Sequence, residues 1–242
     1  MATNKRTLSR IGFYCGLALF LIITLFPFFV MLMTSFKSAK EAISLHPTLL
    51  PQQWTLEHYV DIFNPVIFPF VDYFRNSMVV SVVSSVVAVF LGILGAYALS
   101  RLRFKGRMTI NASFYTVYMF SGILLVVPLF KIITALGIYD TEMALIITMV
   151  TQTLPLAMSG LISVFVYCFM VAWNDYLFAS IFLSSASNFT LPVGLNALFS
   201  TPDYIWGRMM AASLVTALPV VIMYALSERF IKSGLTAGGV KG

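Results

Sequence analysis

Four consecutive residues, Trp173, Asn174, Asp175 and Tyr176, set two aromatic rings beside an amide and a carboxylate. They directly follow a long uncharged run, which places them at the end of an apolar helix. Such a group can bind a polar ligand by stacking and hydrogen bonding, without any covalent step. The structural alternative stays open, because Trp and Tyr at the ends of membrane helices commonly form belts at the lipid–water interface.

The sequence carries none of the common catalytic signatures. It has no P-loop motif to hold ATP phosphates, no HExxH or GxSxG motif, and no paired cysteines at metal-binding spacing. Its two cysteines, Cys15 and Cys168, each lie inside an apolar run. We therefore expect that the chain is not an enzyme and binds no metal or cofactor of its own.

The composition predicts a membrane protein. Hydrophobic residues make up 60% of the chain and charged residues 10%, whereas a soluble domain has about 45–50% and about 25%. The excess falls in uncharged runs that are long enough to cross about 30 Å of hydrocarbon. These runs do not alternate as barrel strands would, so pairing of the backbone in lipid requires helices. The basic residues flank the runs instead of forming a patch, which argues against nucleic-acid binding despite the net charge of +6.

Five uncharged runs predict an all-α, polytopic membrane protein in a single domain over residues 1–242. Dividing the long run 143–173 gives about six transmembrane helices, which are expected at about 11–36, 76–100, 108–130, 143–155, 156–173 and 209–227. None of them contains Asp, Glu, Lys, Arg or His, the residues that serve as proton relays inside membranes. This argues against a proton-coupled carrier.

Basic residues in the connections predict the orientation. The N-terminal arm holds Lys5, Arg6 and Arg10, and the link 101–107 holds four more cations, so both should be cytoplasmic. The segment 37–75 should then lie outside, where His46 and His58 are expected as surface residues.

The run 143–173 does not fit the number of membrane crossings that would keep all basic segments in the cytoplasm. A single crossing puts the basic C-terminal tail outside, whereas two crossings leave too few residues, since each span needs roughly 20. A span over 176–201 would restore the count, but its centre is polar. The simplest interpretation is two helices joined near Leu154–Pro155, with the connection between them removed.

Five motifs follow one another along nearly the whole chain. They are Gln53-Trp54-Thr55-Leu56 with Tyr59 and Phe63, Tyr97-Ala98-Leu99-Ser100-Arg101 with Phe104-Lys105-Gly106-Arg107, Leu136-Gly137-Ile138-Tyr139-Asp140-Thr141, Trp173-Asn174-Asp175-Tyr176, and the terminal Gly234–Gly242. Each is weak alone, but in this order they resemble the membrane-spanning permease subunits of carbohydrate-type ABC importers, a binding-protein-dependent transport family. The resemblance implies the helical bundle of a type I importer.

The resemblance also implies a function and partners. The chain would translocate a sugar or oligosaccharide across the bacterial inner membrane, with its N-terminus in the cytoplasm. Its partners would be a second permease subunit, ATP-binding cassette subunits that bind and hydrolyse the ATP, an external sugar-binding protein and the lipid bilayer. Within such a protein, residues 173–176 become candidates for the substrate path.

One departure from the family concerns coupling. Its members carry a cytoplasmic loop with an EAA…G signature and a following Leu-Pro, which docks on the ATPase. Here that signature is absent, and only the stretch Leu154–Gly160 resembles the end of the loop, with Leu154 and Pro155 as the coupling remnant. The alternative function is therefore a deletion variant that inserts into the membrane but is uncoupled from its ATPase.

Overall fold

The computed structural model describes residues 2–119, 122–154, 161–200 and 206–238, and every regular element in these ranges is a helix. The long helices are α1 (Ala2–Ser35), α4 (Phe70–Arg101) and α11 (Trp206–Gly238). Helices of intermediate length are α5 (Arg107–Met119), α6 (Gly122–Ala135), α7 (Glu142–Thr153) and α8 (Leu161–Trp173). The short elements are α2 (Ala39–Ala42), α3 (Glu57–Ile62), α9 (Leu177–Phe182), η1 (Ala186–Asn188), α10 (Leu191–Ala197) and η2 (Leu198–Ser200). The predicted all-α class is confirmed.

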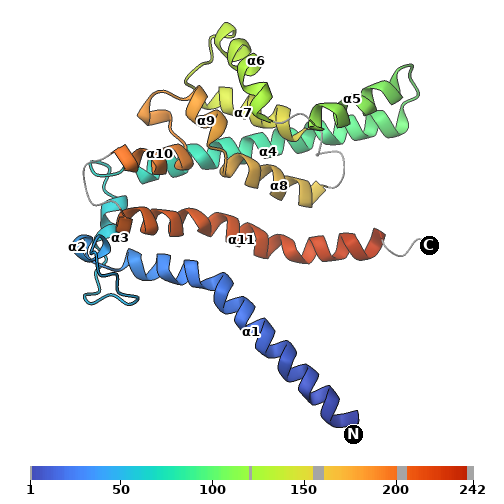
Figure 1. The fold of residues 1–242 in the computed structure, drawn as a ribbon. Coiled ribbons are helices and arrows are strands. Elements are labelled where there is room, and N and C mark those ends of the chain that lie inside the picture. The colour runs from blue at the N-terminus through green and yellow to red at the C-terminus, as the bar shows by residue number, and fades with distance from the viewer. Residues whose placement is uncertain (1, 120–121, 155–160, 201–205, 239–242) are drawn as a thin grey trace.

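The start of α1 and the end of α11 lie at the same end of the molecule. Figure 1 shows the N-terminus, the turn between α4 and α5 and the C-terminal part of α11 at this end, which we call the inner end. Helices α2, α3 and α10 lie at the opposite, outer end. The segments rich in Lys and Arg therefore share one side, which is the arrangement that the predicted orientation requires.

Three helices of the described chain are long and apolar enough to cross a membrane, namely α4 and the segments Arg10–Ser35 of α1 and Trp206–Glu228 of α11. They coincide with the first, second and last of the predicted spans. Within the predicted span 108–130 the described residues form α5 and α6, and residues 120–121 between them lie outside the described part. A single membrane helix over 176–201 does not form, because the described part of this segment consists of short helices.

Helices α7 and α8 form a hairpin that starts and ends near the outer end. The start of α7 adjoins α9, since the Asp140 N–H donates to the Phe182 carbonyl at 2.9 Å, and α8 ends shortly before α9 begins. With 12 and 13 residues, the two helices are only about 18 and 20 Å long. Neither described helix is long enough by itself to cross about 30 Å of hydrocarbon.

The depth of this hairpin follows from its contacts with α4. Val164 and Cys168 of α8 pack against Ala88, and α4 continues from there to Arg101, about 20 Å further toward the inner end. Helix α8 begins three residues before Val164, so its first described turn stops roughly 15 Å short of the end of α4. The predicted junction near Leu154–Gly160 lies, from Pro155 onward, outside the described residues.

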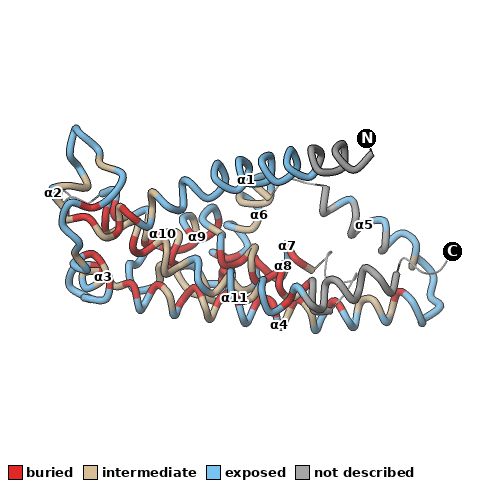
Figure 2. The backbone as a smooth tube through the Cα atoms, turned by 90° about the horizontal axis from the view of Figure 1, so that it is seen from below, coloured by how far each residue is buried: buried red, intermediate tan, exposed pale blue. Residues whose placement is uncertain are grey.

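Small residues let α4 pack closely on α7 and α8. Ser77, Ser81, Ser84 and Ser85 are all buried, and the hydroxyls of Ser84 and Ser85 donate to the Ser81 carbonyl at 3.3 and 2.6 Å. These local hydrogen bonds satisfy the hydroxyls of Ser84 and Ser85, while the short side chains allow the helix backbones to approach. Figure 2 shows the buried residues gathered where α4 and α7–α10 meet, whereas α1 is exposed along most of its described length.

Candidate functional site

The structure uses Trp173 to hold helices together. Its ring is 1% exposed, stacks on Phe169 with the centroids 5.4 Å apart, and meets the Phe74 ring edge-on at the same distance. The indole Nε1–H donates to the Thr216 carbonyl at 3.3 Å. Trp173 thus joins α8 to α4 and α11, and its face is covered by protein in this conformation.

Asn174 and Asp175 stabilise helix ends. The exposed Asn174 side chain donates from Nδ2 to the Met170 carbonyl at 2.8 Å, at the end of α8. The Asp175 carboxylate accepts hydrogen bonds from the Phe178 and Ala179 N–H groups, at 3.5 and 3.0 Å, and so caps the start of α9. Asp175 lies in the connection between α8 and α9, outside the predicted spans, and burial there raises its pKa to about 6.

Tyr176 lines an open cleft of about 280 Å³ near the outer end. The Asn196 Nδ2–H donates to the Tyr176 hydroxyl at 2.9 Å. The cleft is further lined by Pro192, Leu195, Phe199, Met209 and Ser213. Ring faces beside an amide and a hydroxyl suit a polar ring-shaped ligand, and the volume is close to the lower bound of about 300 Å³ for ligand pockets.

The cleft therefore contains one of the four residues that the sequence singled out. Its other walls come from α10, η2 and α11, which follow Tyr176 by about 16 residues or more along the chain. Residues such as Asn196 and Ser213 stand in no recognisable motif, so the sequence offered no signal for them. Only the fold brings these segments to Tyr176.

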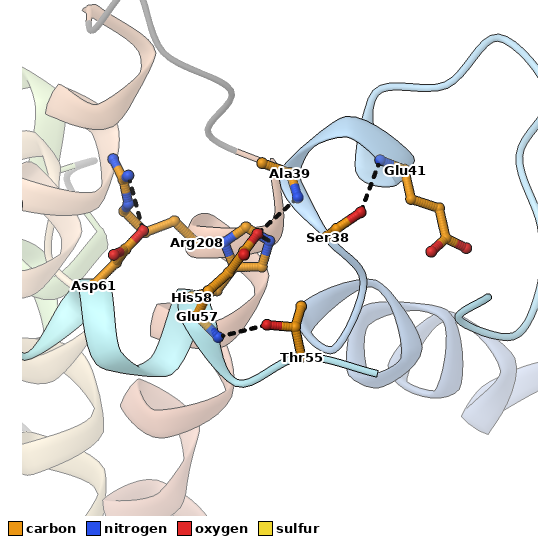
Figure 3. Close-up of polar contacts among 8 residues, drawn as sticks. All are labelled: Ser38, Ala39, Glu41, Thr55, Glu57, His58, Asp61 and Arg208. Atoms are coloured by element: carbon orange, nitrogen blue, oxygen red, sulfur yellow. Dashed lines mark hydrogen bonds and ion pairs between the residues drawn. The ribbon is translucent and has the colours of Figure 1, made fainter. Parts of the chain in front are cut away.

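A second polar group ties α3 to its neighbours at the outer end, and we call these contacts the outer latch (Figure 3). Arg208 of α11 forms an ion pair with Asp61 of α3, with the Nη2–Oδ2 distance 3.1 Å. The Tyr59 hydroxyl lies 2.9 Å from the Ser35 hydroxyl at the end of α1. The Ala39 N–H donates to a Glu57 carboxylate oxygen at 2.8 Å. Together these bonds hold the ends of α1 and α11 against the segment 36–62.

The prediction that His58 is a surface residue is wrong. His58 is 2% exposed because α3 lies on α11, where Gly207 has no side chain and lets the ring approach its backbone. Neither ring nitrogen has a hydrogen-bond partner among the described residues. Burial therefore lowers the pKa of His58, against the opposing charge of Glu57. The other outer histidine, His46, is exposed as predicted.

Asp140 clamps two outer loops together. Its carboxylate accepts hydrogen bonds from the N–H groups of Ser184 and Ser185, at 2.7 and 3.0 Å, and from the Ser185 hydroxyl. Its carbonyl accepts from Asn188 Nδ2 at 2.7 Å. These bonds hold the pKa of Asp140 at about 2, chiefly through Ser185. The clamp stabilises the loop after α9 without facing the cleft.

The predicted coupling remnant is described only in part. The Leu154 N–H donates to the Val150 carbonyl at 2.9 Å, and Leu154 is half-buried at the end of α7. Pro155 lies outside the described residues.

No family model matches the chain. It is 85% identical over 280 aligned residues, covering 100% of both chains, to the inner membrane ABC transporter permease protein YcjP of Escherichia coli K12. It is 34% identical, over 99% of both chains, to the trehalose/maltose transport system permease protein MalG of Thermococcus litoralis.

A solved structure shares the fold. It is the crystal structure of a bacterial ABC transporter involved in the import of the acidic polysaccharide alginate, which matches with a TM-score of 0.74 and 19% identity over 93% of this chain and 97% of that chain.

The alignments also measure a difference in length. The comparison with YcjP runs over 280 positions while this chain has 242 residues, so at least 38 positions hold no residue of this chain. Despite this gap, two relatives above 30% identity match almost from end to end. The chain belongs to the family of ABC transporter permeases, the membrane subunits of sugar-transport systems.

Proposed function

We propose that the chain is the membrane-spanning subunit of a bacterial inner-membrane importer for a sugar or oligosaccharide, powered by ATP that separate subunits bind and hydrolyse. The full-length match to an inner membrane ABC permease carries this proposal. Relatives named for trehalose and maltose transport support a saccharide substrate. A second permease subunit and an external sugar-binding protein complete the assembly.

The cleft beside Tyr176 is the proposed substrate contact. It opens near the outer end, and Met209 and Ser213 of its wall belong to the same helix as Arg208 of the outer latch. A movement of α11 that releases Asp61 would therefore also reshape the cleft. This connects the external segment 36–62 to a ligand in the cleft through one rigid element.

Uptake of a labelled saccharide by cells that supply the partner subunits tests the proposed function. We expect uptake to depend on this chain once the docking loop to the ATPase has been restored. We expect the variant Tyr176→Ala to reduce uptake. Tyr224→Ala is the matched control, because Tyr224 is 58% exposed and does not line the cleft. Equal losses for both variants would remove the cleft from the substrate path.

We propose as the alternative a membrane-inserted form of this chain that is uncoupled from its ATPase. Two observations support it: the described α7–α8 hairpin stops roughly 15 Å short of the inner end of α4, and the alignment with YcjP leaves positions without a residue of this chain. A permease that lacks the docking loop of its relatives would have no segment through which a movement of the ATPase could reach the helical bundle.

Co-purification from detergent tests the uncoupled form. We expect the ATPase subunit to be lost on washing, and a loop of the relatives' length inserted after Pro155 to restore both binding and uptake. An insertion of equal length after Gly137, in an outer loop, is the control. ATPase that stays bound in stoichiometric amount to the chain as it stands would refute the uncoupled form and leave the transport proposal intact.

A further inference from the structure

The turn that joins α4 to α5 alternates basic and apolar residues. Arg101, Arg103, Lys105 and Arg107 occupy every second position, with Leu102 and Phe104 between them and Met108 directly after Arg107. Three of the cations are exposed and Arg107 is half-exposed. Within the described chain, none of the four forms an ion pair or a side-chain hydrogen bond. The turn therefore presents uncompensated positive charge.

The apolar residues of this turn are also uncovered. Leu102 is 50% exposed, Phe104 40% and Met108 81%. Exposing these apolar side chains to water would be unfavourable. In a membrane, the acyl chains would cover the apolar residues while anionic headgroups pair with the cations. The alternation thus fits a boundary between acyl chains and headgroups better than it fits bulk solvent.

The length of α4 sets the depth of the turn. The helix has 32 residues and is about 48 Å long, compared with about 40–45 Å for a bilayer with its headgroups. Its outer end is held by Asn76, whose Nδ2 donates to the Ser187 and Phe189 carbonyls at 2.8 and 3.1 Å. The opposite end of α4 therefore reaches the headgroup layer, where the turn reverses at Gly106 with φ +90°.

We propose that the basic turn 101–107 binds the phosphate groups of anionic glycerophospholipids, such as phosphatidylglycerol, and anchors the inner end of α4 and α5. Clusters of four or more Lys and Arg next to a membrane helix attract anionic lipid in this way. A free phosphate offers the same charge but leaves Leu102, Phe104 and Met108 uncovered, so the lipid is the favoured source. The inference rests on the insertion of α4 and not on sugar transport, so the two can fail separately.

Native mass spectrometry of the purified full chain tests the lipid site. With phosphatidylglycerol and phosphatidylcholine added in equal amounts, we expect preferential retention of phosphatidylglycerol. Each cation near an anionic surface contributes about fivefold, so the variant R103Q/K105Q should weaken phosphatidylglycerol binding roughly 30-fold. The matched control is K40Q/K131Q, which removes the same charge from exposed lysines elsewhere and should leave the affinity unchanged.

Two further measurements keep the test decisive. Retention by the unmodified chain should fall as sodium chloride rises, because the attraction is electrostatic, and this needs no variant that could insert incorrectly. Millimolar inorganic phosphate should fail to displace the lipid. Equal retention of both lipids, equal losses in the control pair, salt-independent retention or displacement by phosphate would each overturn the proposal.

A fifth outcome would point to protein as the occupant. If R103Q/K105Q kept its phosphatidylglycerol but lost an ATPase subunit that the loop-restored chain holds, the turn would be a protein contact and the lipid proposal would be refuted.

Discussion

Replacing Gly207 by alanine would put a methyl group into the space of the His58 ring. A β-carbon at Gly207 would lie 2.0 Å from Nε2 and 2.2 Å from Cδ2 of His58, whereas carbon contacts are optimal at about 3.5–4.0 Å. The Arg208–Asp61 ion pair, at 3.1 Å, holds the two helices together, so either the ring moves by more than about 1 Å or α3 separates from α11. We expect overpacking to cost about 1–3 kcal/mol.

Thermal unfolding in detergent measures this cost. For a chain of this size, about 1–3 kcal/mol corresponds to a loss in Tm of about 2–12 °C, at 2–4 °C per kcal/mol. Hydrogen exchange should rise in residues 57–62 before it rises in α4, since the clash lies in the outer latch. Gly95→Ala is the matched control, because no atom lies within 4 Å of its β-carbon and alanine is the better helix former.

A double variant separates a clash from a general defect. Adding His58→Ala to Gly207→Ala removes the ring that the methyl group meets, so the double variant should melt above Gly207→Ala alone. Residues in direct contact typically show coupling of about 0.5–3 kcal/mol. A Gly207→Ala variant that melts with the unmodified chain, or a double variant whose losses simply add, would refute the reasoning.

Three more outcomes follow from the described contacts. The pKa of Asp140 is held at about 2, so its clamp should stabilise the fold above about pH 4 and be lost as pH falls toward 2; Asp140→Asn should flatten the melting temperature over this window. The pKa of Asp175 is raised to about 6, so its contribution should become less favourable as pH rises from about 4 to 6, and Asp175→Asn should abolish that slope. Reporters fused before the N-terminus and after Gly242 should both read as cytoplasmic, because α1 begins and α11 ends at the inner end; signals from opposite sides of the membrane would contradict the arrangement in Figure 1.

The helices that face lipid could be predicted because a hydrocarbon environment requires a simple sequence pattern. A segment that must satisfy its backbone in hydrocarbon has to be helical, long and uncharged, and α1, α4 and the membrane part of α11 carry that pattern over their whole length. The outer segments do not show this sequence pattern. Residues 176–201 are apolar enough to suggest a span, yet the contacts of Asp140 and Asn76 with them fold the described part into short helices at the outer end.

The candidate site was likewise predictable from the sequence only in part. The motif at 173–176 pointed to the right region, but a motif cannot distinguish a ring that faces a ligand from one that packs on neighbouring helices. Burial of Trp173 against Phe74 and the pairing of Tyr176 with Asn196 depend on helices that are distant in the sequence. His58 was misplaced for a related reason, since the residue that admits its ring, Gly207, lies on another helix.

The sequence by itself determined the membrane class, the all-α fold, the family resemblance and the mismatch in the run 143–173, because charge, hydropathy and motif order are properties of the linear chain. Only the tertiary structure decided which of residues 173–176 faces a cleft, how α3 is latched to α11, and how far the described α7–α8 hairpin reaches along α4. These depend on contacts between distant segments, and their energies come from close packing and paired polar groups that no local pattern records.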